Sequence, residues 1–345
     1  MKSYCKNLII NEAFVSEAYE KWRHNEAGRK NHWRVDKHHG GKESLVKEIV
    51  NEINARTLTF DPIKTKPCND SRKTRDIGIE PVKQQICGYI VDLAIEDLWN
   101  AKIGYWQISR PGFGQFHAAH TIQRWLTSCL YHVHLDIKKC YDNIKCESVY
   151  RILAKYIHCP EILYTANAIM KSYPGKHLMI GSYFSLRMAM LVLSFGYHYV
   201  ESIPKQMEFH QCWYVDDVWL IAKSKSDLHR VINSLSNFLY SKFNLQLKPW
   251  KICQSGQMEP ADIAGITISP DKITIRSTTF IKTRRTVIRY QKKQDNIQLA
   301  RRLLSYNGWL KNTDCSKFIK NNGVHKLRTK AKQLISTNDR RLTCQ

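Results

Sequence analysis

The sequence predicts an α+β fold, in which helices cover one face of an antiparallel sheet and leave the other face open. Alternating or β-branched residues at 131–137 and 211–222 predict strands. Apolar residues at helical spacing over 43–53, 82–99 and 228–239 predict helices. The expected order of strand, helix, hairpin, helix and strand is typical of such a layered domain.

Positive charge dominates the composition, because 54 Lys and Arg residues face 30 Asp and Glu residues, which gives a formal net charge of +24 at pH 7. Residues 269–345 hold 19 of these cations against four Asp and no Glu. Segregated charge of this kind favours a polyanionic partner such as nucleic acid. A basic surface that serves only solubility is the alternative interpretation.

The cysteines and the apolar segments bear on the cellular compartment. Eleven cysteines occur, and none lies in a C-x-x-C pair, which predicts reduced thiols. The N-terminus lacks the apolar stretch of a secretory signal, and the most apolar segment, near 188–195, is far shorter than the roughly 20 residues that span a bilayer. We expect a soluble, cytoplasmic protein with no membrane contact.

Two polar segments precede the first predicted strand. Residues 21–42 are basic, rich in His and interrupted by Gly, which predicts a loop or extension lying on nucleic acid. Their His residues lack Cys or carboxylate partners at metal-ligand spacing, so a zinc site is disfavoured. Residues 66–81 are rich in turn formers and end in an alternating strand, which predicts a cationic hairpin.

Three carboxylates are expected at strand ends. In YHVHLDI, alternation places Asp136 on the face opposite Val133 and Leu135, and Asp216 and Asp217 lie at the tip of a predicted hairpin. An Asp-Asp turn alone is often only structural, because Asp favours turns. Three acids on adjacent strands repel one another unless a cation lies between them, and Mg²⁺ prefers such oxygen ligands. Two metal ions in this arrangement suit nucleotidyl transfer.

Two of these segments resemble motifs of the reverse transcriptase family. LDIKKCYDNI at 135–144 matches L-D-I-x-x-x-Y/F, and YVDD at 214–217 matches Y-x-D-D. The resemblance implies a right-hand polymerase fold of fingers, palm and thumb. The antiparallel palm sheet would be backed by helices, and the thumb would be helical and basic.

The resemblance also implies roles for individual residues near these motifs. Asp136, Asp216 and Asp217 would be catalytic and would hold two Mg²⁺ ions, for which Mn²⁺ would substitute. The Ile137 carbonyl would be a further metal ligand. The ring of Tyr141 would be the gate that excludes a ribose 2′-hydroxyl.

Further segments resemble the nucleotide-binding parts of bacterial reverse transcriptases. KTRDIGIEPVKQQI is similar to the fingers segment whose basic residues hold the incoming triphosphate, which would be Lys73 and Arg75. A planar guanidinium suits that role, since it can bind phosphate with two hydrogen bonds. GKHLMIGSYFSLRMAM resembles the template and nucleotide-pocket motif, in which Gly181 and Ser182 would contact the nucleotide.

The pocket motif departs from its usual form at several positions. Met179 stands where Pro is usual, Phe184 where a small hydroxyl residue is usual, and Leu186 where Gln is usual. These departures raise the hypothesis of template-independent or protein-directed DNA synthesis.

The C-terminal segments complete the resemblance. FNLQLKPWKI resembles the motif whose lysine is proposed to protonate pyrophosphate, here Lys251, and ADIAGITI resembles the primer-grip hairpin. SYNGWLKNTDCSKF resembles thumb helices of bacterial reverse transcriptases. The expected domains are a basic N-terminal extension at 1–60, fingers at 61–130, a palm at 131–268 with part of the fingers inserted, and a basic helical thumb at 269–345.

These features together predict an RNA-directed DNA polymerase that binds dNTPs, an RNA template or non-coding RNA, and its DNA product. The SRPGFGQ segment is most similar to defence-associated bacterial enzymes, related to those of retrons, group II introns and diversity-generating retroelements, which implies an anti-phage role with a dedicated non-coding RNA. An oligomer or a partner polymerase is a further expectation. An RNA-dependent RNA polymerase and an inactive RNA-binding scaffold are the alternatives.

Overall fold

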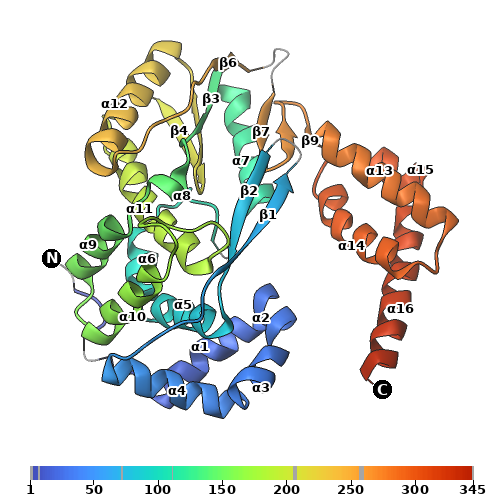
Figure 1. The fold of residues 1–345 in the computed structure, drawn as a ribbon. Helices are drawn as coiled ribbons and strands as arrows, with labels where there is room; N and C mark the ends of the chain where they lie inside the picture. Colours follow the sequence, from blue (N-terminus) through green and yellow to red (C-terminus); the bar gives the residue numbers. More distant parts are fainter. Residues whose placement is uncertain are drawn as a thin grey trace.

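Helices and antiparallel strands alternate along the chain, as the sequence predicts (Figure 1). The structure is a computed structural model and describes residues 3–6, 8–70, 73–110, 112–204, 208–255 and 260–343. Figure 1 shows the first helices at one end of the molecule, the sheets above them, and the C-terminal helices to one side.

The N-terminal segment is helical, so the expectation of a loop at 21–42 is wrong. It forms α1 (Glu12–His24), α2 (Glu26–Asn31), α3 (Trp33–His39) and α4 (Lys42–Ala55). The buried residues of α1 recur at helical spacing, and α1 packs on α5 (Val82–Ala94) through them; they are Val15, Ala18, Tyr19 and Trp22. Burial of this apolar face stabilises a helix that the basic composition conceals.

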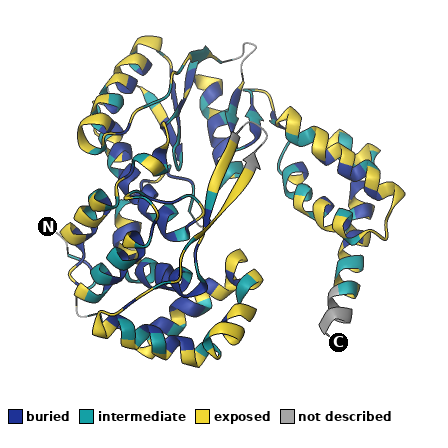
Figure 2. Cartoon of the chain, in the orientation of Figure 1, coloured by how far each residue is buried: buried dark blue, intermediate teal, exposed yellow. Residues whose placement is uncertain are grey.

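A two-stranded ribbon follows these helices, which confirms the cationic hairpin. Its strands β1 (Lys64–Asp70) and β2 (Lys73–Ile79) are antiparallel, with Cys68 opposite Arg75. Most of the ribbon is exposed (Figure 2).

The helix expected over 82–99 is interrupted. It consists of α5 and α6 (Glu96–Lys102), which meet at the buried Ile95. The acidic residues Glu96 and Asp97 begin α6, where the helix dipole favours negative charge.

The central sheet has four antiparallel strands in the order β4-β5-β3-β6. They are β3 (Tyr131–Asp136), β4 (Phe209–Tyr214), β5 (Asp217–Ala222) and β6 (Ile252–Gln254). One face is covered by α11 (Tyr183–Glu201) and α12 (Lys225–Phe243), which share a core with Val133, Leu135, Val218 and Leu220.

The second face of this sheet is not open over most of its length, which corrects the sequence expectation. Trp219 and Ile221 pack against α7 (Gln115–Ser128) and a three-stranded sheet of β7 (Ala261–Ile263), β8 (Ile266–Ile268) and β9 (Ile273–Ile275). His132 is buried on the same side. The uncovered part of this face lies toward the end of β3 that carries His134 and Asp136, both of them accessible to solvent.

The remaining helices are α8 (Cys140–Asn143), α9 (Cys146–Tyr156), α10 (Pro160–Lys171), α13 (Ser277–Lys292), α14 (Ile297–Lys311), α15 (Ser316–Asn321) and α16 (Val324–Thr343). The last four have a core of their own around Val287, Tyr290 and Leu303. The domain limits given by the sequence stay a prediction; the limit at 268 falls between β8 and β9, which pair with each other. In the described part of the chain, no helix is long and apolar enough to cross a bilayer.

Candidate active site

The three predicted carboxylates meet at one end of the central sheet. Asp136 is the last residue of β3, and Asp217, the first residue of β5, is its direct cross-strand partner. Asp216 precedes it in the turn, where its carbonyl oxygen accepts a hydrogen bond from the Ile137 amide at 3.2 Å. Direct partners project from the same face with Cβ atoms about 5 Å apart, so the two strands place Asp136 and Asp217 side by side.

The turn between β4 and β5 holds a strained residue. Val215 has a φ of 52°, a left-handed conformation that glycine adopts readily and a β-branched residue rarely adopts. Two-residue hairpins require such angles, because their twist must match that of the strands. The pairing of Tyr214 with Asp217 closes this turn and fixes Asp216 at its tip.

Asp216 experiences the repulsion that the sequence predicts. Burial raises its pKa to about 6, and the charges of Asp217 and Asp136 add to the increase. The positive charge of Arg75 acts in the opposite direction, which places this residue of β2 within electrostatic reach of the site. The charge of Arg75 therefore acts on the carboxylate end of the sheet, and its role in binding the triphosphate stays a prediction.

Two basic side chains that sequence reasoning missed hold the other two carboxylates. Lys248 Nζ donates to Asp136 Oδ2 at 2.5 Å, and the Lys248 amide donates to the Asp136 carbonyl at 2.8 Å. His134 Nε2 lies 2.8 Å from Asp217 Oδ1, and its ring stacks on Trp219 with centroids 4.7 Å apart. His134 lies two residues before Asp136 on the same strand face, and this spacing could have indicated that its ring lies near the carboxylates.

The carboxylates suit a divalent cation, although their side chains do not converge on one point in this structure. Asp136 Oδ1 is buried without a hydrogen-bond partner, which leaves an oxygen donor directed at no protein group. Within the described residues, no three His, Cys, Asp or Glu side chains converge closely enough to form a ready-made metal site. Lys248 and His134 each contact one oxygen of Asp136 and Asp217, respectively.

We expect Lys248→Gln to tighten divalent-metal binding, because the ammonium group competes with the ion for Asp136. A partly exposed ion pair contributes up to about 1 kcal/mol, so the dissociation constant should fall roughly fivefold. Calorimetric titration with Ca²⁺ would measure the change. Lys251→Gln removes an equal charge three residues away and should have a smaller effect; equal effects of both variants would contradict a specific contact.

Tyr141 lies beside the carboxylates, on the short helix α8 that follows β3. The side chain is half-buried, and burial raises the pKa of its phenol, with Cys140 and Asp216 adding to the shift. The hydroxyl is therefore neutral at physiological pH. Its position near Asp216 is compatible with the gate role, which stays a prediction.

The predicted nucleotide-pocket residues join α11 to the ribbon. The Gly78 amide donates to the Ile180 carbonyl at 2.8 Å, and Gly181 has a φ of 102°. A Cβ on Gly181 would lie 2.5 Å from the Gly78 carbonyl oxygen, so only glycine fits. Ser182 caps α11 by accepting from the Ser185 amide at 3.1 Å and is itself buried.

Gly181→Ala should therefore destabilise the protein. The added Cβ meets the ribbon backbone in a strained conformation, and the free energy of unfolding should fall by about 1 to 3 kcal/mol. A Cβ added to Gly308, inside α14, would have nothing within 4 Å of it. Gly308→Ala should raise the free energy of unfolding by about 0.5 to 1 kcal/mol, because alanine favours helix. Urea denaturation of both variants would show the contrast.

The unusual residues of the pocket motif have packing roles. Met179 is buried beneath Gly78, and a Cβ on that glycine would overlap its sulfur. Phe184 is buried against Gly88 of α5. Leu186 differs from both, because it lines a cavity of about 640 Å³ that also contains Tyr214.

Lys73 and Lys251 are the remaining predicted site residues. The side chain of Lys73 lies outside the described residues. Lys251 is exposed just before β6, whereas Lys248 makes the contact with Asp136. The roles of Lys73 and Lys251 stay predictions.

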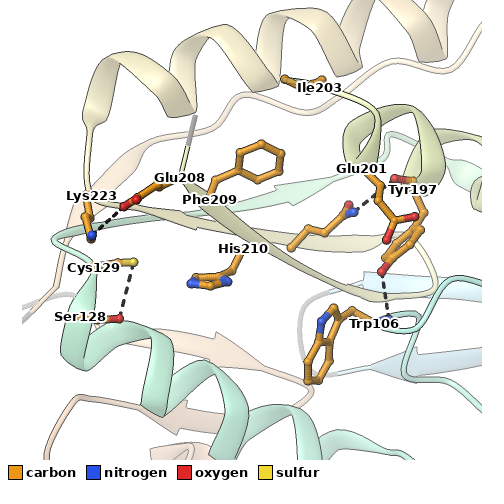
Figure 3. Close-up of a pocket in the computed structure, with 11 residues that line it drawn as sticks. Trp106, Ser128, Cys129, Tyr197, Glu201, Ile203, Glu208, Phe209, His210 and Lys223 are labelled. Atoms are coloured by element: carbon orange, nitrogen blue, oxygen red, sulfur yellow. Dashed lines mark hydrogen bonds and ion pairs between the residues drawn. The ribbon is translucent and has the colours of Figure 1, made fainter. Parts of the chain in front are cut away.

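A separate cavity of about 540 Å³ lies at the far end of the β4–β5 hairpin (Figure 3). Some of its polar groups are paired within the protein: Lys223 Nζ lies 2.6 Å from a carboxylate oxygen of Glu208, and the Trp106 backbone amide donates to the Tyr197 hydroxyl at 3.3 Å. Lys223, the residue after β5, lines this cavity, whereas Asp217 begins that strand. The carboxylate end of the sheet is the better candidate for chemistry.

An antiparallel sheet with paired carboxylates at one end, facing a cationic ribbon, defines the palm of a right-hand polymerase fold. The profile of the reverse transcriptase (RNA-dependent DNA polymerase) family matches residues 45–268, and the chain belongs to this family. No curated protein sequence matches the chain.

Two solved structures are similar to this chain. Apo telomerase from Candida tropicalis, truncated from the C-terminal domain, has 13% identity and a TM-score of 0.41, with 68% of this chain and 60% of that chain covered. Telomerase from Candida albicans, in complex with the TWJ fragment of telomeric RNA, has 13% identity and a TM-score of 0.48, with 86% and 65% covered. The chain thus spans less than two thirds of either telomerase chain.

Proposed function

We propose that this protein is an RNA-directed DNA polymerase that adds deoxynucleotides to a 3′-hydroxyl at the Asp136, Asp216 and Asp217 site. The pairing of Asp136 with Asp217 beside Asp216 carries the proposal, because it gathers hard oxygen donors at one sheet end. The Ile137 carbonyl is the proposed fourth donor. Two Mg²⁺ ions, when bound, would activate the hydroxyl and stabilise the leaving pyrophosphate, and Mn²⁺ would substitute.

The surrounding residues have complementary proposed roles. Arg75, already within electrostatic reach of Asp216, binds the incoming triphosphate together with Lys73. Tyr141 excludes the 2′-hydroxyl, Gly181 and Ser182 shape the nucleotide pocket, and Lys251 supplies the proton to pyrophosphate.

The C-terminal helices supply charge for holding the nucleic acid. On α13, the exposed cations Lys282, Arg284, Arg285 and Arg289 lie on the side of the helix opposite the buried Val287 and Tyr290. Such a row neutralises phosphates without reading sequence. We propose that these helices grip the duplex of template and product.

Primer extension tests the function directly. Purified protein with an RNA template, an annealed DNA primer, dNTPs and Mg²⁺ should produce extended DNA. A clear preference for NTPs over dNTPs would instead favour an RNA-dependent RNA polymerase. Failure to incorporate any nucleotide, by protein that still binds RNA, would favour an inactive scaffold.

A second candidate function is template-independent or protein-directed DNA synthesis by the same site. Leu186 favours it, because an apolar side chain lines the cavity next to Tyr214 where an amide is usual. Protein stripped of nucleic acid and supplied with single dNTPs should then make simple polymers. Absolute dependence on added template would refute this candidate.

The biological setting that we propose is anti-phage defence with a dedicated non-coding RNA and, further, an oligomer or a partner polymerase. The net charge of +24 supports a lasting RNA partner. Sequencing the nucleic acid that copurifies with the protein should recover one abundant RNA species. A random mixture of cellular RNA would contradict a dedicated partner.

A further inference from the structure

An exposed tryptophan stands at the start of α3, far from the carboxylates in the sequence. Trp33 leaves 49% of its surface accessible, whereas Trp22 on the neighbouring α1 is fully buried. Tryptophan is ordinarily well buried, so an accessible ring suggests a partner. The indole Nε1 donates to the Lys30 carbonyl at 3.2 Å, which satisfies the polar atom and fixes the ring.

Two cations stand over this ring. Arg34 Cζ lies 5.4 Å and Lys37 Nζ 5.8 Å from its centroid. Neither cation has a described ion pair within the chain. Sites for single-stranded nucleic acid combine an aromatic platform for a base with nearby cations for the backbone. Trp33, Arg34 and Lys37 supply both parts within five residues.

The ring borders a cavity of about 730 Å³ between α3 and the root of the β1–β2 ribbon. Phe60 and Ile79, the latter 41% exposed, add apolar surface to this cavity, and Arg34 and Lys64 add positive charge. A volume of this size accommodates a ligand with both apolar and polar parts, such as a nucleotide.

Carboxylates also line the cavity, and most of them are paired or buried within the protein. Lys83 Nζ lies 2.7 Å from both Glu48 and Glu52, and Glu48 is 3.3 Å from His39 as well. Glu80 is buried, and burial raises its pKa. Asp61 is the remaining acid among the described lining residues, and two cations, Arg34 and Lys64, line the same cavity.

We propose that Trp33 stacks on an unpaired base of single-stranded nucleic acid, whose phosphates lie against Arg34 and Lys64. Figure 1 shows α3 below the ribbon, and Lys64 and Arg75 belong to its two strands. A strand bound at Trp33 can therefore continue along the ribbon toward the carboxylates. The site binds without chemistry, so it is independent of whether the polymerase proposal holds.

Fluorescence anisotropy with a short labelled oligouridine, without dNTPs, tests this site. One base stacked on an aromatic ring contributes about 1 to 3 kcal/mol, so Trp33→Ala should weaken binding roughly tenfold. Trp33→Tyr keeps a ring and should retain most of the affinity. Tyr240→Ala is the matched control, since Tyr240 on α12 is 57% exposed and lies outside the cavity.

An abasic oligomer of the same length separates stacking from charge. The wild-type protein should bind it more weakly than oligouridine, whereas Trp33→Ala should bind the two oligomers equally. Unchanged affinity in Trp33→Ala, or an equal loss in Tyr240→Ala, would overturn the proposal. Anisotropy without dNTPs reports binding alone and primer extension reports incorporation, so a failure of the polymerase proposal can be distinguished from a failure of this one.

Discussion

Asp216→Asn should abolish nucleotide incorporation while leaving RNA binding intact. The amide keeps the shape of the side chain but removes a negative charge that the proposed metal ions require. We expect a loss of at least roughly a thousandfold, since such a change removes stabilisation of charge in the transition state. Primer extension measures the loss, and anisotropy with labelled RNA is the control for folding. Incorporation within tenfold of the wild type would refute the assignment.

The same variant should stabilise the metal-free protein. Asp216 has a pKa raised to about 6, so its ionised form is disfavoured in the folded state. In the unfolded chain the group ionises near pH 4, so the free energy of unfolding falls as the pH rises from about 4 to 6 and then levels. At pH 7, Asp216→Asn should therefore raise the free energy of unfolding by about 1 to 3 kcal/mol. At pH 4 the difference in the free energy of unfolding between the variant and the wild type should largely vanish. A difference that does not change with pH would contradict the raised pKa of Asp216 as its cause.

Tyr141→Ala should admit ribonucleotides. If the half-buried ring next to Asp216 occupies the space of a 2′-hydroxyl, its removal leaves room for that group. The preference for dNTPs over NTPs should then fall by roughly a hundredfold, the size of discrimination that steric fit commonly supplies. Competition between dNTPs and NTPs in primer extension measures the ratio.

Tyr141→Phe is the matched control for that experiment. It keeps the ring and loses only the hydroxyl, whose pKa burial holds above its usual range. Discrimination should remain close to that of the wild type. Equal loss in both variants would point to the hydroxyl instead of the ring, and an unchanged ratio in Tyr141→Ala would remove Tyr141 from the gate role.

The gathering of the carboxylates at one end of the sheet could be predicted from the sequence, because it depends on local patterns of residues. Alternation fixes the face on which Asp136 projects, and the two apolar runs around Asp216 and Asp217 define the hairpin. The pairing of β3 with β5 then follows from the family resemblance. The cationic ribbon was predictable for the same reason, since turn formers separate two short strands.

The contact between Lys248 and Asp136 could not be predicted locally. It depends on the segment at 246–248 running beside the end of β3, where the Lys138 amide donates to the Gln246 carbonyl at 2.8 Å. The family motif drew attention to Lys251, three residues later. Only the tertiary arrangement shows which of the two lysines reaches the carboxylate.

The N-terminal helices show a different reason for failure. Basic residues, His and Gly in 21–42 indicated an irregular segment, yet the apolar residues Val15, Ala18 and Trp22 already had helical spacing upstream. The basic and polar composition of the segment concealed the helical spacing of the few apolar residues. The covered second sheet face was missed because β9 and α7 come from distant parts of the chain.

The hydrogen bond between Gly78 and Ile180 attaches the β1–β2 ribbon close to Arg75. Arg75 lies three residues from Gly78, about 10 Å along an extended strand. A rotation of about 10° at Gly78 would therefore displace Arg75 by about 2 Å, enough to make or break a contact with phosphate. Most of the described ribbon on the far side of Gly78 is exposed, with Ile77 partly buried. The proposed recognition of the triphosphate would therefore depend on the angle that the ribbon takes at Gly78.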